Sequence, residues 1–449
     1  MLNIGKMAPG SEDYYLHAVA RGVEDYYLGR GEAPGRWLGH GLELHGLEGK
    51  VTAEHLSSVL AGADIATGEP LARRQASVPG FDLTFRAPKS VSLLWALGDT
   101  DTSAAVQKAH DAAVVAAFDY LEREAARTRR GPQGVEQCAV DGLTAAAFRH
   151  RTSRAGDPLL HTHVLVANCV RTSDDGIWRT LDGRALYQHA RTAGFLYQAH
   201  LRHELTHRLG VAWEPVVNGM ADIAGVDRDW IDAFSKRRTA IVAELEARGE
   251  SSARAAQVAT LATRQAKTDQ PDEPTLRQRW RAEAKGLGIP ADAFDRTLHR
   301  AEPTVPELDG LARELLGPEG LTREASTFTG RDVVRAIAER SPVGAPVGWV
   351  ELCADRLIDQ ARARDEVVAL GHSNGHLAEV LRRSDGTAIP PTPGDARLTT
   401  AELLHLEQAA ADAAVARRRD GLGLPAVKVD PVIASRPTLA GELAGCSAL

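Results

Sequence analysis

An alternation of apolar and polar residues in two short segments most constrains how this chain folds. In residues 81–86 the apolar side chains at positions 81, 83 and 85 alternate with polar ones, which is the period of a half-buried strand. Residues 159–170 alternate in the same way and place His161 and His163 on one face. A further strand is predicted for residues 144–149. The chain should therefore contain a sheet with a polar, histidine-bearing face.

Long segments with helical spacing separate these predicted strands. Apolar residues recur every three or four positions over residues 103–127, and a second long helix is predicted for 184–209, where Gly210 ends it. Residues 90–97 form a short predicted helix, and 227–300 are mostly helical, with breaks at the two prolines near 271–274. Strands mixed with helices in this order predict an α+β domain.

The chain of 449 residues is about three times the usual length of a single domain, so two or three domains are expected. Prolines at 303, 306 and 318 indicate a linker that ends a first domain at about residue 300. We expect residues 301–420 to be a smaller, mostly helical region with room for two strands. Residues 421–449 contain three prolines and no periodicity, and they are expected to be disordered.

The charge is distributed unevenly along the chain. A formal net charge of -7 argues at face value against a nucleic-acid partner. Residues 1–300, however, hold 37 of the 53 basic and 38 of the 60 acidic residues, a net charge of -1, which leaves -6 for residues 301–449. Affinity for DNA follows the phosphates that are contacted. Several basic clusters could contact phosphates or could be only solvated helix faces. They are Arg73 and Arg74; Arg127, Arg129 and Arg130; Arg151 and Arg154; and Lys236, Arg237 and Arg238.

Four scattered cysteines are too few for a disulfide framework, and the N-terminus lacks a secretory signal pattern. No apolar run approaches the roughly 18 residues of a membrane helix. We therefore expect a cytoplasmic protein with no membrane insertion. The sequence also lacks a phosphate-binding G-x-x-x-x-G-K-[ST] motif, so no ATP site is expected.

Four of the seven tyrosines occur as two adjacent pairs, Tyr14-Tyr15 and Tyr26-Tyr27. One interpretation is that these aromatic pairs pack an N-terminal helix onto the core. The other is that their hydroxyls attack a phosphodiester and form a covalent phosphotyrosine. A phenol with a pKa near 10 needs assistance for that reaction at neutral pH.

His161 and His163, together with His150, offer three imidazoles that converge if the strands carrying them are neighbours. Three nitrogen donors suit a divalent metal and leave positions open for phosphate oxygens. The alternative is that these are surface or satisfied core histidines. Asp82 lies on the outward face of its predicted strand, where its carboxylate could accept a tyrosine proton or orient a histidine ring, or could simply be solvated.

Taken together, these motifs resemble those of the TrwC-like (MobF-type) conjugative relaxases of the HUH endonuclease superfamily. The resemblance covers roughly residues 1–300. It rests on the two tyrosine pairs, Pro34-Gly35-Arg36-Trp37, Phe81-Asp82-Leu83-Thr84-Phe85, Ala87-Pro88-Lys89-Ser90, Phe148-Arg149-His150, Gly156-Asp157-Pro158 and Leu160-His161-Thr162-His163.

The resemblance implies an antiparallel sheet that bears the histidines, surrounded by helices, in a protein that nicks one DNA strand at an origin of transfer. It implies that Tyr14 is the first nucleophile and Tyr26 the second, with Tyr15 and Tyr27 as neighbours. His150, His161 and His163 would hold the metal, expected to be Mg²⁺ or Mn²⁺, and Asp82 would act as a base or orient a ligand.

The implied partners are single-stranded and origin-of-transfer DNA, with accessory relaxosome proteins, a coupling protein and a separate helicase as further candidates. Residues 301–420 resemble the segment that precedes a helicase in this family. Two other hypotheses stay open from the residues alone. One is a non-catalytic remnant that binds an origin or regulates transcription, and the other is a metal phosphohydrolase whose tyrosines only bind substrate.

Overall fold

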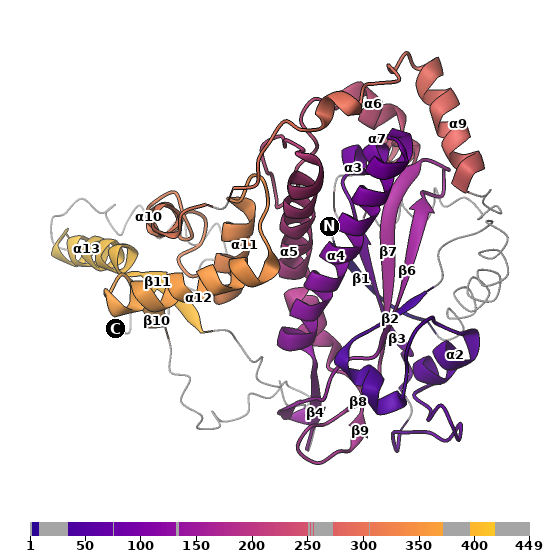
Figure 1. Ribbon diagram of the computed structural model, residues 1–449. Helices are drawn as coiled ribbons and strands as arrows, with labels where there is room; N and C mark the ends of the chain where they lie inside the picture. The colour runs from indigo at the N-terminus through magenta and orange to yellow at the C-terminus, as the bar shows by residue number, and fades with distance from the viewer. Residues whose placement is uncertain are drawn as a thin grey trace.

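The computed structural model describes residues 2–8, 35–74, 76–131, 134–249, 252, 255, 273–304, 306–370 and 396–417. Its larger part is built around a five-stranded sheet with the order β1-β3-β7-β6-β2, in which every neighbouring pair is antiparallel (Figure 1). The strands are β1 (Leu2–Lys6), β2 (Arg36–Leu38), β3 (Gly80–Arg86), β6 (Ala145–Thr152) and β7 (Pro158–Ala167).

Three helices cover one face of this sheet: α3 (Lys89–Leu97), α4 (Thr100–Ala125) and α5 (Gly183–Leu209) (Figure 1). Phe81, Leu83 and Phe85 of β3 point into the core between the sheet and these helices, and all three are almost completely buried. The alternation in this segment therefore predicts the buried face correctly. Polar residues at positions 82, 84 and 86 lie on the opposite face.

The opposite face of the sheet is only partly covered by the described residues. A second apolar cluster, which includes Leu56 and Leu60 of α2 (Ala53–Ala61), packs against Phe148 and Leu165. The cluster includes Ala146 of β6 and Leu165 of β7, which are direct cross-strand neighbours. The adjoining positions on the same face carry the histidines instead of apolar side chains.

The predicted elements differ from the observed ones mainly at their ends. Strand β7 ends at Ala167, earlier than the predicted end at 170, and the side chain of the next residue, Asn168, donates to the carbonyl of Val78 and accepts from the amide of Leu181. Strand β6 continues to Thr152, so His150 lies within it. Helix α5 ends at Gly210, which has the left-handed φ of 63°, as predicted.

We predict a helix break at Pro274, and the structure shows that this prediction is wrong. Pro274 lies in the first turn of α9 (Glu273–Gly286), where the missing amide proton costs no hydrogen bond. Other elements of residues 1–300 are η1 (His40–His45), β4 (Arg127–Arg130), β5 (Glu136–Ala139), β8 (Val170–Arg171), β9 (Trp178–Arg179), α6 (Arg228–Ala233), α7 (Lys236–Arg248) and η3 (Asp295–Thr297).

The region after residue 301 is mostly helical and contains a two-stranded antiparallel sheet, as predicted. Its elements are α10 (Leu308–Leu316), α11 (Gly330–Glu339), α12 (Val347–Ala363), β10 (Val367–Leu370), β11 (Arg397–Thr400) and α13 (Ala401–Arg417). Helices α11 and α12 pack against α5 (Figure 1). Apolar residues of this region and of the sheet domain form one continuous buried cluster. None of the helices within the described residues is long and apolar enough to cross a membrane.

A buried arginine joins the two regions. Arg202 of α5 is 1% exposed and donates hydrogen bonds to the carbonyl oxygens of Gly219, Ala338 and Ser341, at 2.9, 2.9 and 3.3 Å. Burial lowers its pKa to about 10, so the guanidinium stays charged at neutral pH. Close by, Gly344 has a φ of 82°, and a Cβ there would lie 2.2 Å from the Ala199 carbonyl oxygen. The two regions thus meet in close backbone contact.

We expect Arg202→Met to lower the free energy of unfolding of the whole chain by about 3–5 kcal/mol, because three buried carbonyls lose their donor at once. Urea denaturation followed by circular dichroism measures this loss. Arg208→Met is the matched control on the same helix, since Arg208 pairs with Glu204 in an exposed position and should cost less than about 1 kcal/mol. Equal losses in the two variants would contradict the role assigned to Arg202.

Candidate metal centre

The three histidines lie on adjacent strands in two rows that cross the sheet. In the first row, Arg86 of β3, His161 of β7 and His150 of β6 are direct cross-strand neighbours. In the second row, Thr84 and Phe148 flank His163. Directly opposed residues of antiparallel strands project from the same face, with Cβ atoms about 5 Å apart. The predicted placement of His150 beside the other two histidines is therefore confirmed.

One nitrogen from each of His150, His161 and His163 lies within 4.8 Å of the others. The ring centroids are 4.9 to 5.2 Å apart. Among the described residues, this is the only group of three or more histidine, cysteine or acidic side chains with that spacing. Three imidazole nitrogens at this separation can bind one divalent transition metal ion and leave coordination positions open.

Hydrogen bonds orient the rings of His161 and His163. Nδ1 of His161 lies 2.9 Å from the carbonyl oxygen of Leu159, so this nitrogen carries the proton and Nε2 keeps a free lone pair. Burial, with a smaller contribution from His163, lowers the pKa of His161 to about 3. His161 is therefore neutral near pH 7, as a metal ligand must be.

Asp82 holds the ring of His163. Its two carboxylate oxygens lie 2.8 and 2.9 Å from Nδ1 of His163, and Thr84 donates its hydroxyl proton to the same carboxylate at 3.2 Å. A carboxylate bonded to Nδ1 fixes the tautomer and makes Nε2 a better ligand. These contacts suit the ring-orienting role that we predicted for Asp82 as one of two possibilities.

The opposite face of β7 carries a buried polar chain that the sequence did not suggest. His110 of α4 is completely buried, and its two ring nitrogens lie 2.7 Å from the Tyr197 hydroxyl and 2.7 Å from the Thr162 hydroxyl. Thr162 lies between two of the metal-site histidines. This hydrogen-bonded chain therefore ties the centre of β7 to α4 and α5 directly behind the site.

We expect Asp82→Asn to weaken metal binding about 10- to 100-fold, because the amide keeps a hydrogen-bond acceptor for His163 but loses the negative charge. Isothermal titration calorimetry with Mn²⁺ measures the affinity. Asp141→Asn is the control. Asp141 forms an ion pair with Arg171, with 2.6 Å between the charged atoms, and it takes no part in the histidine cluster. An unchanged Mn²⁺ affinity in Asp82→Asn would show that Asp82 does not support the metal site.

The predicted tyrosine nucleophiles Tyr14, Tyr15, Tyr26 and Tyr27 lie outside the described residues. The strands on either side of this segment are described. Strand β1 pairs with β3, and β2 pairs with β6, so both ends of the segment join the sheet that carries the histidines. The proposed nucleophiles are thus connected at both ends to the strands of the site.

The predicted basic residues have different surroundings. Arg73, Arg74, Arg154 and Arg238 are exposed. Arg151 is 7% exposed, and its Nη1 lies 3.2 Å from a carboxylate oxygen of Glu273. Lys236 bonds Glu283 at 2.5 Å and Asp157 at 3.3 Å, while Arg237 is half-buried.

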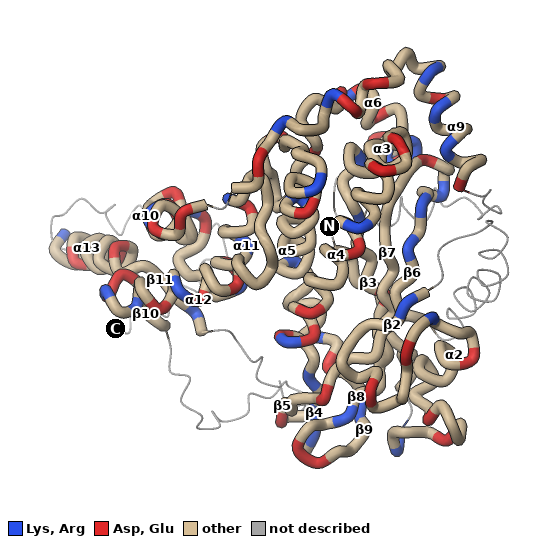
Figure 2. The backbone as a smooth tube through the Cα atoms, in the orientation of Figure 1, with Lys and Arg blue, Asp and Glu red and all other residues tan. Residues whose placement is uncertain are grey.

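Basic residues also gather on α9, which the sequence did not single out, and on the neighbouring part of β6 (Figure 2). In α9 they are Arg277, Arg279, Arg281 and Lys285. Arg277 is engaged within the protein, because its guanidinium bonds the carbonyl of Trp95 at 2.9 Å and the hydroxyl of Ser103 at 2.7 Å. The sequence does contain a signal for this basic helix, because arginine occurs at every second position from 277 to 281.

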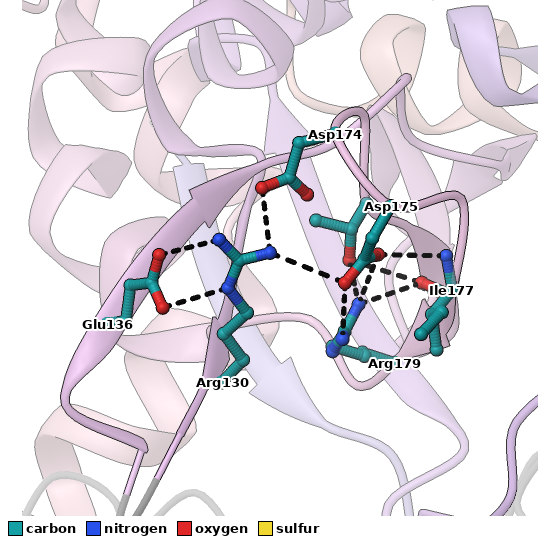
Figure 3. Close-up of polar contacts among 7 residues, drawn as sticks. Arg130, Glu136, Asp174, Asp175, Ile177 and Arg179 are labelled. Atoms are coloured by element: carbon teal, nitrogen blue, oxygen red, sulfur yellow. Dashed lines mark hydrogen bonds and ion pairs between the residues drawn. The ribbon is translucent and has the colours of Figure 1, made fainter.

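The cluster at residues 127–130 is largely neutralised by ion pairs. Arg130 lies between Glu136 on one side and Asp174 and Asp175 on the other, and Arg179 also bonds Asp175 (Figure 3). These pairs join the hairpin of β4 and β5 to that of β8 and β9. The side chains of this cluster therefore stabilise two hairpins, and they are less available to phosphates than isolated arginines would be.

An antiparallel sheet whose polar face holds three converging histidines, two of them oriented by a carboxylate and a carbonyl, is an arrangement that could hold a divalent metal ion, and such an ion is suited to phosphodiester chemistry. The family model described as "TrwC relaxase" matches residues 8–287, more than half of the chain. The chain therefore belongs to the TrwC relaxase family, as its motifs predicted.

Curated relatives agree with this assignment. The chain is 30% identical over 433 residues to a multifunctional conjugation protein TraI of Escherichia coli, and the match covers 90% of this chain. A second TraI, from Escherichia coli strain K12, is 29% identical over 412 residues. The chain spans about a quarter of the length of these relatives, 23% and 22% respectively.

Solved structures of TrwC share the fold. One, a complex of TrwC with a 27-mer DNA that contains the recognition hairpin and the cleavage site, has a TM-score of 0.55 and 34% sequence identity. Another, a metal-bound complex of the conjugative relaxase TrwC with oriT DNA, has a TM-score of 0.56 and 35% identity. Each match covers 65% of this chain and all of the TrwC chain. The prediction of an antiparallel sheet with surrounding helices is confirmed.

Proposed function

We propose that this chain is a conjugative relaxase that nicks one DNA strand at an origin of transfer and forms a covalent 5′-phosphotyrosine adduct. The observation that carries the proposal is the convergence of His150, His161 and His163 on one sheet face in a chain of the TrwC relaxase family. We propose residues 1–300 as the nicking domain, 301–420 as a segment that resembles the one preceding a helicase in this family, and 421–449 as a tail.

In the proposed reaction Tyr14 attacks the phosphorus of the scissile phosphodiester. A bond forms between the phenolic oxygen and phosphorus, and the bond between phosphorus and the 3′ oxygen breaks. The phenol proton leaves to solvent, because the Asp82 carboxylate is engaged with His163, and the departing 3′ oxygen gains a proton, so the charge of the diester is unchanged overall. Tyr26 then provides a second nucleophile while Tyr14 is esterified, with Tyr15 and Tyr27 beside them.

The three histidines fit a divalent metal ion because the Nδ1 atoms of His161 and His163 face Leu159 and Asp82, which makes Nε2 of each ring the nitrogen that we propose as the ligand. When bound, such an ion supplies positive charge to the non-bridging oxygens of the phosphate. We propose Mg²⁺ or Mn²⁺. The residues of the chain supply a rigid frame, because the contacts with Leu159 and Asp82 fix the rings of His161 and His163 before an ion binds.

The proposed substrate is single-stranded origin-of-transfer DNA, contacted by the exposed arginines Arg73, Arg74, Arg154 and Arg238, together with Lys236 and Arg237. Since a phosphotyrosine conserves the energy of the broken bond, religation needs no ATP. Accessory relaxosome proteins, a coupling protein and a separate helicase are the proposed protein partners, in the cytoplasm. Relatives with 29 to 30% identity are conjugation proteins, which supports this setting.

The test is to incubate the full chain with supercoiled DNA cloned from the neighbourhood of its gene, with Mg²⁺ or Mn²⁺, and then to denature the mixture. A strand that remains attached to protein is the expected result. A nick that leaves no protein-linked DNA would instead indicate a metal phosphohydrolase. Specific binding without any nick would indicate a non-catalytic origin-binding remnant. Either of these results would overturn the proposal.

A further inference from the structure

Arg86 is a cationic residue on the face of the sheet that carries the three histidines. It is the last residue of β3 and lies directly opposite His161. Its carbonyl oxygen accepts a hydrogen bond from Gln198 at 3.0 Å, and the amide of Ala87 donates to the Leu160 carbonyl at 3.1 Å. The backbone that carries Arg86 is therefore fixed to both α5 and β7.

The side chain of Arg86 reaches solvent, but neighbouring protein atoms surround much of it and so influence its pKa. Burial lowers the pKa of Arg86, and the nearby carboxylate of Asp82 opposes that shift. The charge of Arg86 in turn contributes to the low pKa of His161, after burial and His163. A guanidinium stays protonated in proteins. A permanent positive charge thus lies beside the histidine cluster.

The charge of the site explains why a cation would be useful here. Attack of a phenolate on a phosphodiester takes the reacting phosphate from one negative charge toward two. A divalent ion and Asp82 together supply a net charge of about +1, and Arg86 raises this to about +2, which matches the charge that develops in the transition state. The planar fork of a guanidinium also fits two phosphate oxygens at once.

We propose that Arg86 binds the non-bridging oxygens of the scissile phosphodiester beside the metal ion and is a catalytic residue of the strand-transfer reaction. This inference rests on the relaxase function proposed above. Arg86 neither gains nor loses a proton in the reaction, and it breaks no bond. The competing role is structural: Arg86 would only balance the charge of Asp82 and so keep His163 in place. The structural role acts on metal affinity, whereas phosphate binding acts on the reaction of bound DNA.

The experiment first maps the nick with the wild-type chain and then uses a single-stranded oligonucleotide that contains this site. Single-turnover formation of the protein-DNA adduct is measured with saturating oligonucleotide and Mn²⁺ for Arg86→Gln and Arg86→Lys. We expect Arg86→Gln to lower the rate about 100-fold and Arg86→Lys to recover part of it. Arg296→Gln, which removes an exposed arginine paired with Asp292, should keep the wild-type rate.

Two binding measurements separate the roles. Calorimetry without DNA should give Arg86→Gln a Mn²⁺ affinity within about twofold of wild type, whereas a structural role predicts a loss like that of Asp82→Asn. A methylphosphonate at the scissile position removes the phosphate charge, and it should weaken binding to the wild-type chain more than to Arg86→Gln.

A wild-type rate in Arg86→Gln, or a rate loss that excess Mn²⁺ restores, would overturn the role of Arg86. The absence of any adduct with the wild-type chain would be a different failure, since it would overturn the proposed relaxase function itself.

Discussion

Tyr14→Phe should abolish the covalent adduct between this chain and single-stranded origin DNA. The variant keeps the aromatic ring but lacks the oxygen that forms the bond to phosphorus, so no partial activity is expected from the same position. The measurement is denaturing gel electrophoresis of the chain after incubation with a labelled oligonucleotide that contains the mapped nick. DNA binding, measured on the same oligonucleotide, should remain within about threefold of wild type because one hydroxyl is a small part of the contact surface.

Tyr187→Phe is the matched control for this experiment. Tyr187 is 43% exposed on α5 and packs edge-on against Phe81, on the helix-covered side of the sheet. This variant should form the adduct at the wild-type rate. Tyr26→Phe should also form the first adduct but fail in the second strand transfer. Undiminished adduct in Tyr14→Phe would move the first nucleophilic role to another tyrosine.

His161→Ala should remove metal-dependent nicking, with a loss of about 100-fold or more. His161 is the central member of the cluster, because its Cα lies opposite that of His150 on β6 and that of Arg86 on β3. Its removal leaves two ligands, which are too few to hold a divalent ion at one position. Nicking of supercoiled DNA with and without chelator, together with Mn²⁺ calorimetry, measures the two consequences.

His405→Ala serves as the control for that variant, since His405 is exposed on α13 far along the chain from the sheet. DNA affinity of His161→Ala should remain near the wild-type value, because the scissile phosphate is only one of the many phosphates that the bound strand presents to the protein. A thermal melt shows whether the variant stays folded, since His161 is 8% exposed. Cleavage at the wild-type rate in the presence of chelator would overturn the assignment of a metal to the histidines.

The placement of the histidines was predictable because side chains alternate along a strand with a period of two. Once residues 159–167 are assigned to a strand, His161 and His163 must share a face. The pairing of this strand with the one that carries His150 was only an assumption from sequence, since strand neighbours depend on contacts that are distant along the chain. The register of β6 on β7 turns that assumption into a site.

The role of Asp82 was also predictable only in part from the sequence. Alternation put its carboxylate on the polar face, but a strand aspartate on that face can be solvated, can act as a base or can orient a ring. The distances of 2.8 and 2.9 Å to Nδ1 of His163 favour the last role. Thr84 and His110 were missed altogether, because a threonine in a strand and a histidine in a helix carry no local signal of their partners.

The sequence by itself therefore determined the fold class, the family and the residue types of the site. Those properties follow from local periodicity and from motifs that lie close together in the chain. Only the tertiary structure decided which residues meet: the order of the five strands, the contact of Asp82 with His163, the burial of Arg202 between the two regions and the position of Arg86 opposite His161. These depend on strand register and helix packing between distant segments, and a one-residue change in register would move every side chain of a strand to the other face.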